Sequence, residues 1–225
     1  TTTAVSMIDY INTTSSCHIV TIEDPIEFFI KDKKAIVSQR EVGIDVGNYE
    51  EALTYLMRED PDVVFIGEVR DATTVAASMR ASETGHLVFG TVHAANASQA
   101  VQRLIDLFPQ VERDLARQTL SLTLRAIISQ LLLPCVKPGI DRIPAVEILL
   151  ANPEARKLIS EKREMDIPNL IRSCTEEGMQ NLTDSLVRLV LDGYVEAKEA
   201  YKHAPNPDEL KMAMKGIRTE KGGIL

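Results

Sequence analysis

The sequence contains no tryptophan, and aromatic residues make up 4% of its 225 residues. Aromatic side chains are the platforms on which single-stranded nucleic acid stacks, so such platforms would be hard to build here. The net charge is −8, and no long block of lysine or arginine occurs. Duplex DNA binding needs a cationic face that displaces counterions. We therefore expect no nucleic-acid partner.

Cysteine is also scarce, since Cys17, Cys135 and Cys174 lie far apart and form no C-x-x-C pair. An odd and scattered set of this kind is typical of a reducing compartment and offers no thiolate zinc site. The apolar runs are much shorter than the roughly 20 residues that span a bilayer. No signal peptide opens the chain. These features predict a cytoplasmic protein without a transmembrane segment.

Apolar runs alternate with helical patterns along the first part of the chain. The runs Val63–Gly67 and His86–Val92 are typical of strands that are covered on both faces of a parallel sheet. Further strands are expected at His18–Glu23, Ala35–Gln39 and Ala145–Leu150, and helices at Thr1–Asn12, from Asn48 to about Glu59, from the Asp71 cap to Gly85, at Ala94–Phe108 and at Val111–Gln130. The alternation predicts an α/β core with a parallel sheet.

The composition changes near Pro134 and Pro138, and the chain after Asn152 is polar, helical in pattern and interrupted by proline. We therefore expect two domains, an α/β core over residues 1–150 and a small C-terminal helical subdomain over residues 151–225. The tail Arg218–Leu225 is expected to be mobile.

Polar residues follow three of the predicted strands. The first strand is followed by Glu23, Asp24 and Glu27, the second, which ends at Gly67, by Glu68 and Arg70, and the third by His93, with Asn96 nearby. In open parallel sheets, ligands bind beyond the carboxyl ends of the strands. Nucleotide hydrolysis needs a carboxylate that polarises water, acids that hold hydrated Mg²⁺ and a group that contacts the terminal phosphate.

Glu68 stands where a water-activating carboxylate would be placed. Asp24 and Glu27 converge on it if their strand is adjacent in the sheet, and His93 could donate to a γ-phosphate oxygen. Each residue also has a simpler interpretation, because an acid after a strand is more often a helix cap or a solvated charge. Arg70 could pair with its neighbour Asp71 at the surface, for less than about 1 kcal/mol, and His86 could begin a strand and hydrogen-bond locally.

Three segments together resemble the motifs of one family. TIEDPIEF (Thr21–Phe28) resembles the aspartate box of secretion and pilus ATPases, DPDVVFIGEVRD (Asp60–Asp71) their Walker B segment, and TGHLVFGTVHAANA (Thr84–Ala97) their histidine box. QREVG (Gln39–Gly43) fits as well. The order and spacing are those of the family, and the similarity runs through nearly the whole chain, which is thereby identified as a member of the type II/IV secretion system ATPases.

The resemblance implies a RecA-like P-loop NTPase fold, a hexameric ring, ATP with Mg²⁺, and nucleotide sites at subunit interfaces. By motif matching, Glu68 is the catalytic glutamate, Asp24 and Glu27 are the aspartate-box acids, and His86 and His93 are the histidine-box pair. The resemblance also places Thr1, Thr2, His86 and Arg70 at the nucleotide, and Thr1, Asp24 and Glu27 at Mg²⁺, directly or through water. Gly67 stands where many P-loop ATPases have aspartate, which suits this family and shifts metal support towards the aspartate box.

The second half of the chain is similar to the pilus retraction (PilT-like) branch. It lacks the four-cysteine zinc insertion of assembly and type II secretion ATPases, and it has GMQ followed by the helix NLTDSL. Glu154–Arg163 keeps Arg156, Leu158, Ile159 and Glu161 of a helix typical of that branch, although plain amphipathic packing also explains it. The branch implies a homohexameric motor that couples ATP hydrolysis to pilus retraction. It would act in the cytoplasm, peripherally at the inner membrane, with a membrane platform protein and other pilus motor ATPases.

Thr1 matches the last position of the phosphate-binding loop G-x-x-x-x-G-K-[ST], whose glycines and lysine are absent from the sequence. We therefore expect a polypeptide of this sequence to hydrolyse ATP negligibly. Two alternative functions remain open at this point. One is a non-catalytic ring or regulatory subunit that keeps the fold, and the other is a related motor of type II secretion, conjugation or pilus assembly.

Overall fold

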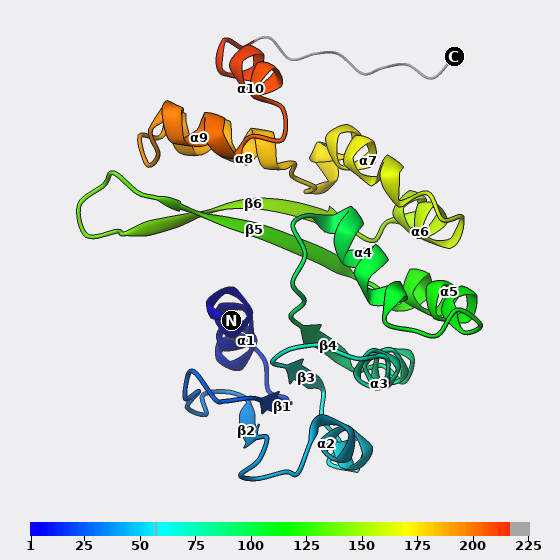
Figure 1. Cartoon of the computed structure of the whole chain (residues 1–225). Helices are drawn as coiled ribbons and strands as arrows, with labels where there is room; N and C mark the ends of the chain where they lie inside the picture. Colours follow the sequence, from blue (N-terminus) through cyan, green and yellow to red (C-terminus); the bar gives the residue numbers. More distant parts are fainter. Residues whose placement is uncertain (57, 217–225) are drawn as a thin grey trace. The chain divides into compact units, whose positions relative to one another are not determined.

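The structure is a computed structural model that describes residues 1–56 and 58–216. The chain divides into two compact units (Figure 1). The first comprises Thr1–His93 and Leu104–Thr123, and the second comprises Ala94–Arg103 and the chain from Leu124 onward. Each unit has its own buried core and is described by itself.

The first unit is built on a parallel sheet. Its strands are β1 (His18–Glu23), β2 (Ile36–Glu41), β3 (Val63–Ile66) and β4 (Leu87–Gly90), in the order β2-β1-β3-β4. All three strand pairs are parallel. Helices α1 (Thr2–Thr14), α2 (Tyr49–Leu56) and α3 (Ala72–Glu83) alternate with the strands, and α5 (Arg113–Thr123) contacts α3. The predicted α/β class with a parallel sheet is confirmed.

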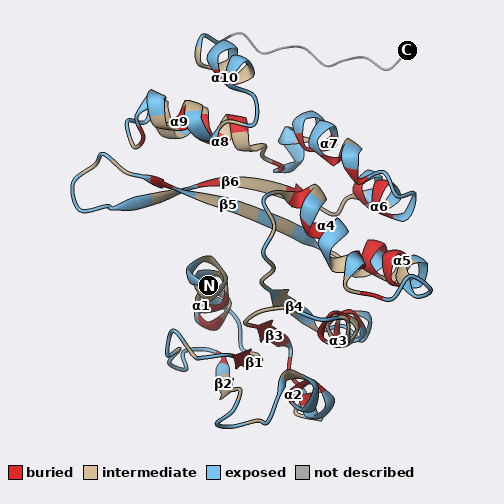
Figure 2. Cartoon of the chain, viewed as in Figure 1, coloured by how far each residue is buried: buried red, intermediate tan, exposed pale blue. Residues whose placement is uncertain are grey.

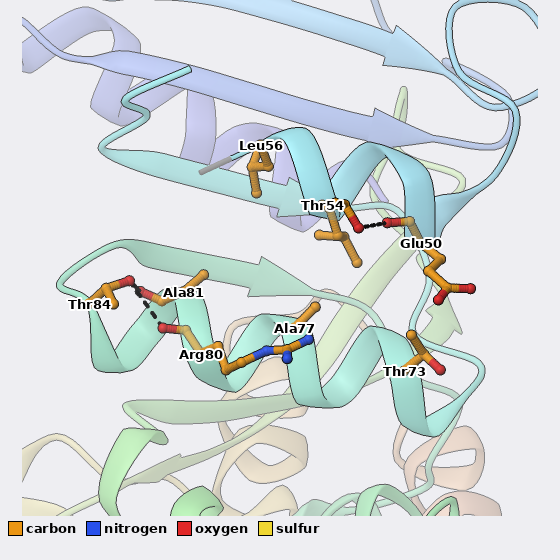
Figure 3. Close-up of a pocket in the computed structure, with 9 residues that line it drawn as sticks. Glu50, Thr54, Leu56, Thr73, Ala77, Arg80, Ala81 and Thr84 are labelled. Atoms are coloured by element: carbon orange, nitrogen blue, oxygen red, sulfur yellow. Dashed lines mark hydrogen bonds between the residues drawn. The ribbon is translucent and has the colours of Figure 1, made fainter. Parts of the chain in front are cut away.

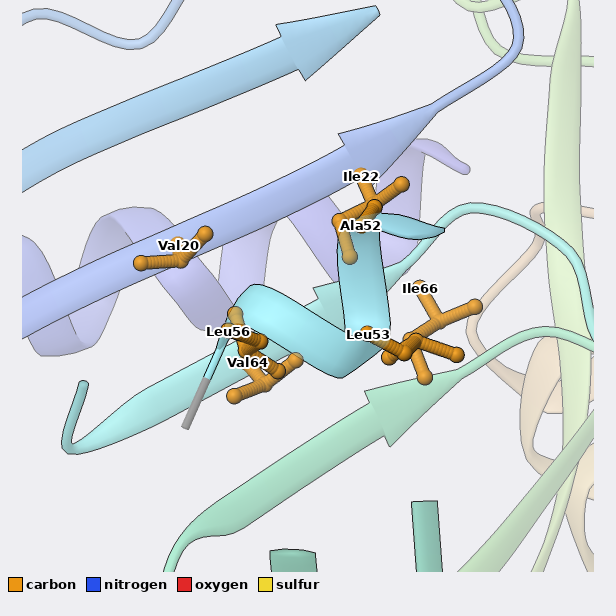
Figure 4. Close-up of a cluster of buried hydrophobic side chains, with 7 residues drawn as sticks. All are labelled: Val20, Ile22, Ala52, Leu53, Leu56, Val64 and Ile66. Atoms are coloured by element: carbon orange, nitrogen blue, oxygen red, sulfur yellow. The ribbon is translucent and has the colours of Figure 1, made fainter. Parts of the chain in front are cut away.

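Both faces of the sheet are covered, as the apolar runs predict. Alternate residues of a strand point to opposite faces. On one face, strand residues pack against helix α2 in a cluster shown in Figure 4: Val20, Ile22, Ala52, Leu53, Leu56, Val64 and Ile66. On the other face, Ile8 of α1 packs with Ile19, Val63 and Phe65. Strands β1 and β3 are therefore almost wholly buried (Figure 2).

The predicted helix caps are also present. The Asp71 side chain accepts a hydrogen bond from the Thr74 backbone N–H at the start of α3, and the Asn48 side chain accepts one from Glu51 N–H at 2.8 Å. Gly85 follows α3 with a φ of +96°, a conformation that glycine adopts without strain. Helix α2 ends at Leu56 rather than near Glu59; residue 57 lies outside the described residues.

The second unit combines an antiparallel ribbon with helices. Strand β5 (Ala126–Pro134) pairs with β6 (Arg142–Leu150) along their whole length. The helices are α4 (Ala97–Asp106), α6 (Pro153–Ser160), α7 (Ile167–Ser173), α8 (Leu182–Leu191), α9 (Ala197–His203) and α10 (Pro207–Met214), with short 3₁₀ turns at Glu164–Asp166 and Thr175–Glu177. Leu133 and Ala145 of the ribbon share a core with Leu186, Ala200 and Leu210 of the helices.

One prediction about this part of the chain is wrong. The helix expected over Val111–Gln130 ends at Thr123, because the following apolar residues pair with β6 instead. The domain boundary at residue 150 stays a prediction; in the structure, the ribbon shares its core with the helices that follow it. The tail Arg218–Leu225 lies outside the described residues.

Within the described part of the chain, every helix is too short or too polar to traverse a lipid bilayer.

Candidate active site

The carboxyl ends of β1 and β3 approach each other closely through Gly67. The Gly67 N–H donates to the Ile22 carbonyl at 2.8 Å, so the ladder continues past the end of β3. A Cβ atom at position 67 would lie 3.2 Å from Glu23 Cα and 3.3 Å from Ile22 O, both backbone atoms. The absence of a side chain therefore permits this approach, which brings the next residue, Glu68, beside the end of β1.

The Glu68 carboxylate lies between a histidine and an arginine. Its Oε1 is 3.3 Å from His93 Nε2 and its Oε2 is 2.5 Å from Arg70 Nη2, with the Glu68 side chain 23% exposed. The structure thus brings Glu68 and His93 together, as the strand ends predict. Arg70 pairs with Glu68 rather than with Asp71, which caps α3, so the alternative of an Arg70–Asp71 surface pair is wrong.

The backbone around Glu68 is tied to the continuation of β4. The Thr91 hydroxyl donates to the Gly67 carbonyl, and the Val69 N–H donates to the Thr91 carbonyl at 2.9 Å. Thr91 therefore holds both neighbours of Glu68 in the chain, Gly67 and Val69, and Thr91 itself lies two residues before His93. We did not predict Thr91 as a site residue, although its place directly after an apolar strand in the histidine-box segment is a usable signal.

Asp24 directly follows β1 and is exposed, and the Asp24–Pro25 peptide bond is cis. The loop after Asp24 is held to β2 by two side chains. Gln39 donates to the Phe28 carbonyl at 2.9 Å and accepts from the Ile30 N–H at 2.7 Å, and Glu41 accepts from the Ile26 N–H at 3.0 Å. The loop that carries the aspartate-box acids is therefore anchored rather than free.

The acids near the end of β1 differ in their surroundings. Glu23 is 2% exposed and accepts hydrogen bonds from the Thr21 hydroxyl and from Gln39 Nε2 at 2.8 and 3.1 Å. Both bonds reach the same carboxylate oxygen from within the fold, which is a structural role. Glu27 is exposed on the anchored loop. Its part in catalysis or metal binding stays a prediction.

Tyr49 is a site residue that sequence reasoning missed. Burial raises the pKa of its phenol, as do the negative charges of Asp24 and Glu68, while Arg70 and a hydrogen bond with the Glu68 backbone oppose the rise. Tyr49 therefore shares one electrostatic environment with three predicted site residues. A tyrosine at the start of a helix carries no sequence signal for such a role.

His86 lies at the opposite edge of the sheet from His93. It precedes β4, whereas His93 follows that strand, and its Nδ1 is 2.9 Å from the Ala81 carbonyl and 3.1 Å from the Thr84 hydroxyl. The local hydrogen bonding that we weighed as the simpler interpretation is present. A nucleotide contact from His86 stays a prediction.

Thr1 and Thr2 stand at the start of α1. Near the other end of this helix, Asn12 accepts hydrogen bonds from the backbone of Lys33 and Lys34, just before β2 begins. The end of α1 thus lies at the amino edge of the sheet, and its start is directed to the carboxyl edge, where Glu68 lies. The predicted contacts of Thr1 and Thr2 with nucleotide and metal stay predictions.

A cavity of about 390 Å³ lies between α2 and α3 (Figure 3). It is lined by Glu50, Leu53, Thr54, Leu56, Thr73, Ala77, Arg80, Ala81 and Thr84. None of the predicted site residues lines this cavity. The candidate site is instead the sheet edge around Glu68.

The family of the chain is decided by a protein-family model described as type II/IV secretion system protein, which matches residues 1–202. The chain belongs to the type II/IV secretion system protein family. The predicted site residues Asp24, Glu68 and His93 all lie within the matched region.

Relatives within this family point to pilus motors. The chain is 42% identical to a twitching motility protein of Neisseria gonorrhoeae over 93% of its own length and 56% of that protein. It is also 42% identical to the type IV pilus retraction ATPase PilT of Pseudomonas aeruginosa, over 92% of the chain and 60% of PilT. The fold resembles a crystal structure of the pilus retraction motor PilT with bound ADP, with a TM-score of 0.83 and 45% identity over 93% of this chain and 59% of that one.

The similarity extends more weakly to a further ATPase. The structure of DotB from Legionella pneumophila matches with a TM-score of 0.78 and 27% identity, over 89% of this chain and 55% of that one. The chain thus spans between half and two thirds of the length of these relatives.

Members of this family are expected to use Mg²⁺, and the carboxylates at the carboxyl edge of the sheet suit this ion. Asp24 and Glu68 offer carboxylate oxygens, which are hard ligands that Mg²⁺ prefers. No three histidine, cysteine, aspartate or glutamate side chains gather into a metal-binding group among residues 1–56 and 58–216.

Proposed function

We propose that this chain is the catalytic part of a homohexameric motor ATPase that couples ATP hydrolysis to type IV pilus retraction. The observation that carries the proposal is the position of Glu68 between Arg70 and His93 at the carboxyl edge of a parallel sheet. Its support from relatives is the similarity to twitching motility and pilus retraction proteins over more than nine tenths of the chain.

In this proposal, each residue at the carboxyl edge of the sheet has its own role in ATP hydrolysis. The Glu68 carboxylate accepts a hydrogen bond from the attacking water and polarises it. Arg70, which pairs with Glu68 in this structure, turns to the nucleotide when ATP is bound. His93 lies close enough to Glu68 for its imidazole to donate to a γ-phosphate oxygen next to that water. The negative charge that develops on the phosphate oxygens is stabilised by these donors.

The remaining predicted residues hold the nucleotide and its metal. Mg²⁺ bound with ATP neutralises developing charge on the phosphates. The Thr1 hydroxyl and the carboxylates of Asp24 and Glu27 would hold waters of that ion. Thr2 would add a contact to the nucleotide at this edge, whereas a contact from His86, at the opposite edge, would be to a nucleotide at a subunit interface.

The partners in this proposal are further copies of the chain, a pilus platform protein of the inner membrane and other pilus motor ATPases. The protein works in the cytoplasm, held peripherally at the inner membrane through these partners. A 39% identical relative, the type IV pilus ATPase PilU of Pseudomonas aeruginosa, represents the last class of partner.

The test is steady-state ATP hydrolysis by the full-length protein with Glu68→Gln. The amide keeps the size of the side chain but cannot act as a base. We expect kcat to fall by about 10²- to 10⁴-fold, while ADP binding measured by calorimetry stays unchanged. Glu83→Gln, at the exposed end of α3, is the matched control and should hydrolyse ATP like the wild type.

In cells, twitching should be lost with Glu68→Gln and kept with Glu83→Gln. If the Glu68→Gln protein hydrolyses ATP at the wild-type rate, the assignment of Glu68 is wrong. If hydrolysis falls as expected but pilus retraction persists without the protein, the chain serves another secretion motor.

A further inference from the structure

Gln39 and Glu41 lie side by side on β2. Residues two apart on a strand point to the same face of the sheet, and the register places these two beside Thr21 and Glu23 of β1. Val37, on the same face, packs against the apolar cluster to which α1 contributes. This face is therefore apolar towards the amino end of the strands and polar towards their carboxyl end.

The Gln39 amide binds the loop that follows β1 at two points. Its Nε2 donates to the Phe28 carbonyl at 2.9 Å, and its Oε1 accepts from the Ile30 N–H at 2.7 Å. The same Nε2 donates to Glu23 Oε1 at 3.1 Å. Because a carboxylate only accepts hydrogen bonds, Glu23 turns the amide so that its oxygen is left for Ile30. The buried acid thus sets the orientation in which Gln39 holds the loop.

The Glu41 carboxylate binds the same loop closer to β1. Its Oε2 accepts a hydrogen bond from the Ile26 N–H at 3.0 Å. Ile26 and Phe28 are the neighbours of Glu27 in the chain, so β2 holds the main chain on both sides of this residue. Glu27 itself is exposed. A predicted site residue is therefore carried by a stretch of backbone that two side chains of β2 hold in place.

We infer that Gln39 and Glu41 are positioning residues that hold Glu27 near the carboxyl end of β2. This inference rests on the proposed function, in which the Glu27 carboxylate holds water of the Mg²⁺ that is bound with ATP. A displacement of about 1 Å can remove most of the effect of a group that orients a reactant. The segment QREVG, of which Gln39 and Glu41 are the first and third residues, thereby gains a role in hydrolysis without contacting the nucleotide.

The test uses Glu41→Ala and Gln39→Glu in the full-length protein. Glu41→Ala removes the acceptor for the Ile26 N–H, and Gln39→Glu removes the donor to the Phe28 carbonyl and places a second carboxylate beside Glu23. In steady-state hydrolysis, the Mg²⁺ concentration that gives the half-maximal rate should rise and kcat should fall, each by about 2- to 10-fold, which corresponds to the loss of one hydrogen bond. Glu41→Gln keeps an oxygen that accepts from the Ile26 N–H and should restore both values.

Glu27→Ala separates positioning from a general effect on the fold. If Glu41 acts through Glu27, then Glu41→Ala should cause no further loss of kcat in a protein that already carries Glu27→Ala. Glu83→Ala, at the exposed end of α3, is the matched control and should leave both kinetic values unchanged. Additive losses in the double variant would contradict the inference, as would wild-type kcat and wild-type Mg²⁺ dependence in Glu41→Ala.

A second measurement requires no ATP. Phe28 and Phe29 are 42% and 87% exposed, so chymotrypsin, whose specificity pocket accepts aromatic side chains, can cut the loop after either residue when the loop opens. Cleavage there, identified by mass spectrometry, should be about 2- to 10-fold faster in Glu41→Ala and Gln39→Glu than in the wild type and Glu41→Gln. Wild-type cleavage rates in both variants overturn the inference. If the wild type hydrolyses no ATP, the proposed function fails, and cleavage then decides by itself whether β2 holds this loop.

Discussion

At the residue scale, the environment of each carboxylate decides its role. Glu23 and Glu68 both follow apolar strands, but Glu23 is buried and takes hydrogen bonds from Thr21 and Gln39. Glu68 is partly exposed and meets Arg70 and His93. A buried, hydrogen-bonded acid stabilises the fold, whereas an accessible one next to an arginine and a histidine is available for chemistry.

Glu147 of β6 is a third case. It is half-buried, and its carboxylate accepts a hydrogen bond at 2.8 Å from the Ala97 N–H at the start of α4. Burial raises the pKa of Glu147, and the hydrogen bond opposes the rise without cancelling it. The ionised form of Glu147 therefore carries a desolvation cost in the folded protein.

We predict that the stability of Glu147→Gln relative to the wild type is greater at pH 7 than at pH 4. The amide oxygen still accepts the hydrogen bond from the Ala97 N–H but bears no charge. A raised folded pKa means that the folded chain keeps a proton that the unfolded chain has lost. The wild type then loses stability as pH rises from the unfolded pKa through the folded one, and the variant does not. Urea unfolding of both proteins across pH 4 to 7 measures this difference.

Glu176→Gln, at an exposed position, provides the control. The pH dependence of its free energy of unfolding should be the same as that of the wild type. A Glu147→Gln protein whose stability tracks the wild type across the range would show that Glu147 titrates normally.

At the scale of elements, two glycines set the spacing of the strand ends in different ways. A Cβ atom at Gly67 meets the backbone of β1, whereas one at Gly90 would lie 2.9 Å from Val69 Cγ2, a side-chain atom. A side chain can be truncated and backbone cannot, so the two positions should respond differently to a second substitution.

We predict that Gly67→Ala and Gly90→Ala each destabilise the protein by about 1–3 kcal/mol through overpacking. Val69→Ala should relieve Gly90→Ala, with a coupling energy of about 0.5–3 kcal/mol in a double-mutant cycle. The same truncation should leave the cost of Gly67→Ala in place, so that this second pair is additive. Denaturant unfolding of the single and double variants gives both cycles.

Additivity in the Gly90–Val69 cycle would mean that the end of β4 moves away from Val69 to admit a methyl group. A Gly67→Ala protein as stable as the wild type would mean that the close approach of β1 and β3 does not constrain the residue before Glu68.

At the scale of the whole molecule, charge sets the class of partner. With a net charge of −8 and few aromatic residues, the chain has few groups that would bind a polyanion such as DNA. It has no excess of cations from which counterion release could provide binding free energy. The partners in the proposed function are proteins and a nucleotide, which fits this balance.

We predict that the full-length protein, in the absence of ATP, does not bind a labelled DNA duplex at physiological salt more tightly than about 10⁻⁴ M, the weak limit of non-specific binding. Fluorescence anisotropy measures this directly. Tighter binding that weakens steeply with added salt would reveal a cationic surface and exclude our interpretation of the composition.

The sequence by itself determined the parallel α/β core and the identity of the motifs. Strand β1 has the predicted bounds, and the caps Asn48 and Asp71 act as expected, because apolar runs and capping side chains are local signals. The motifs at the strand ends predicted that Glu68 and His93 would meet, since parallel strands end at one edge of a sheet.

Tertiary structure alone decided the features that depend on distant partners. Residues 126–134 form a strand because β6 pairs with them, although their apolar run also suits a helix. His86 is separated from His93 by the length of β4, and Tyr49 lies beside Gly67 because the chain after β2 returns to the end of β1 before α2 begins. Local propensity cannot specify these contacts, because the free energy that selects them comes from residues far away in the chain.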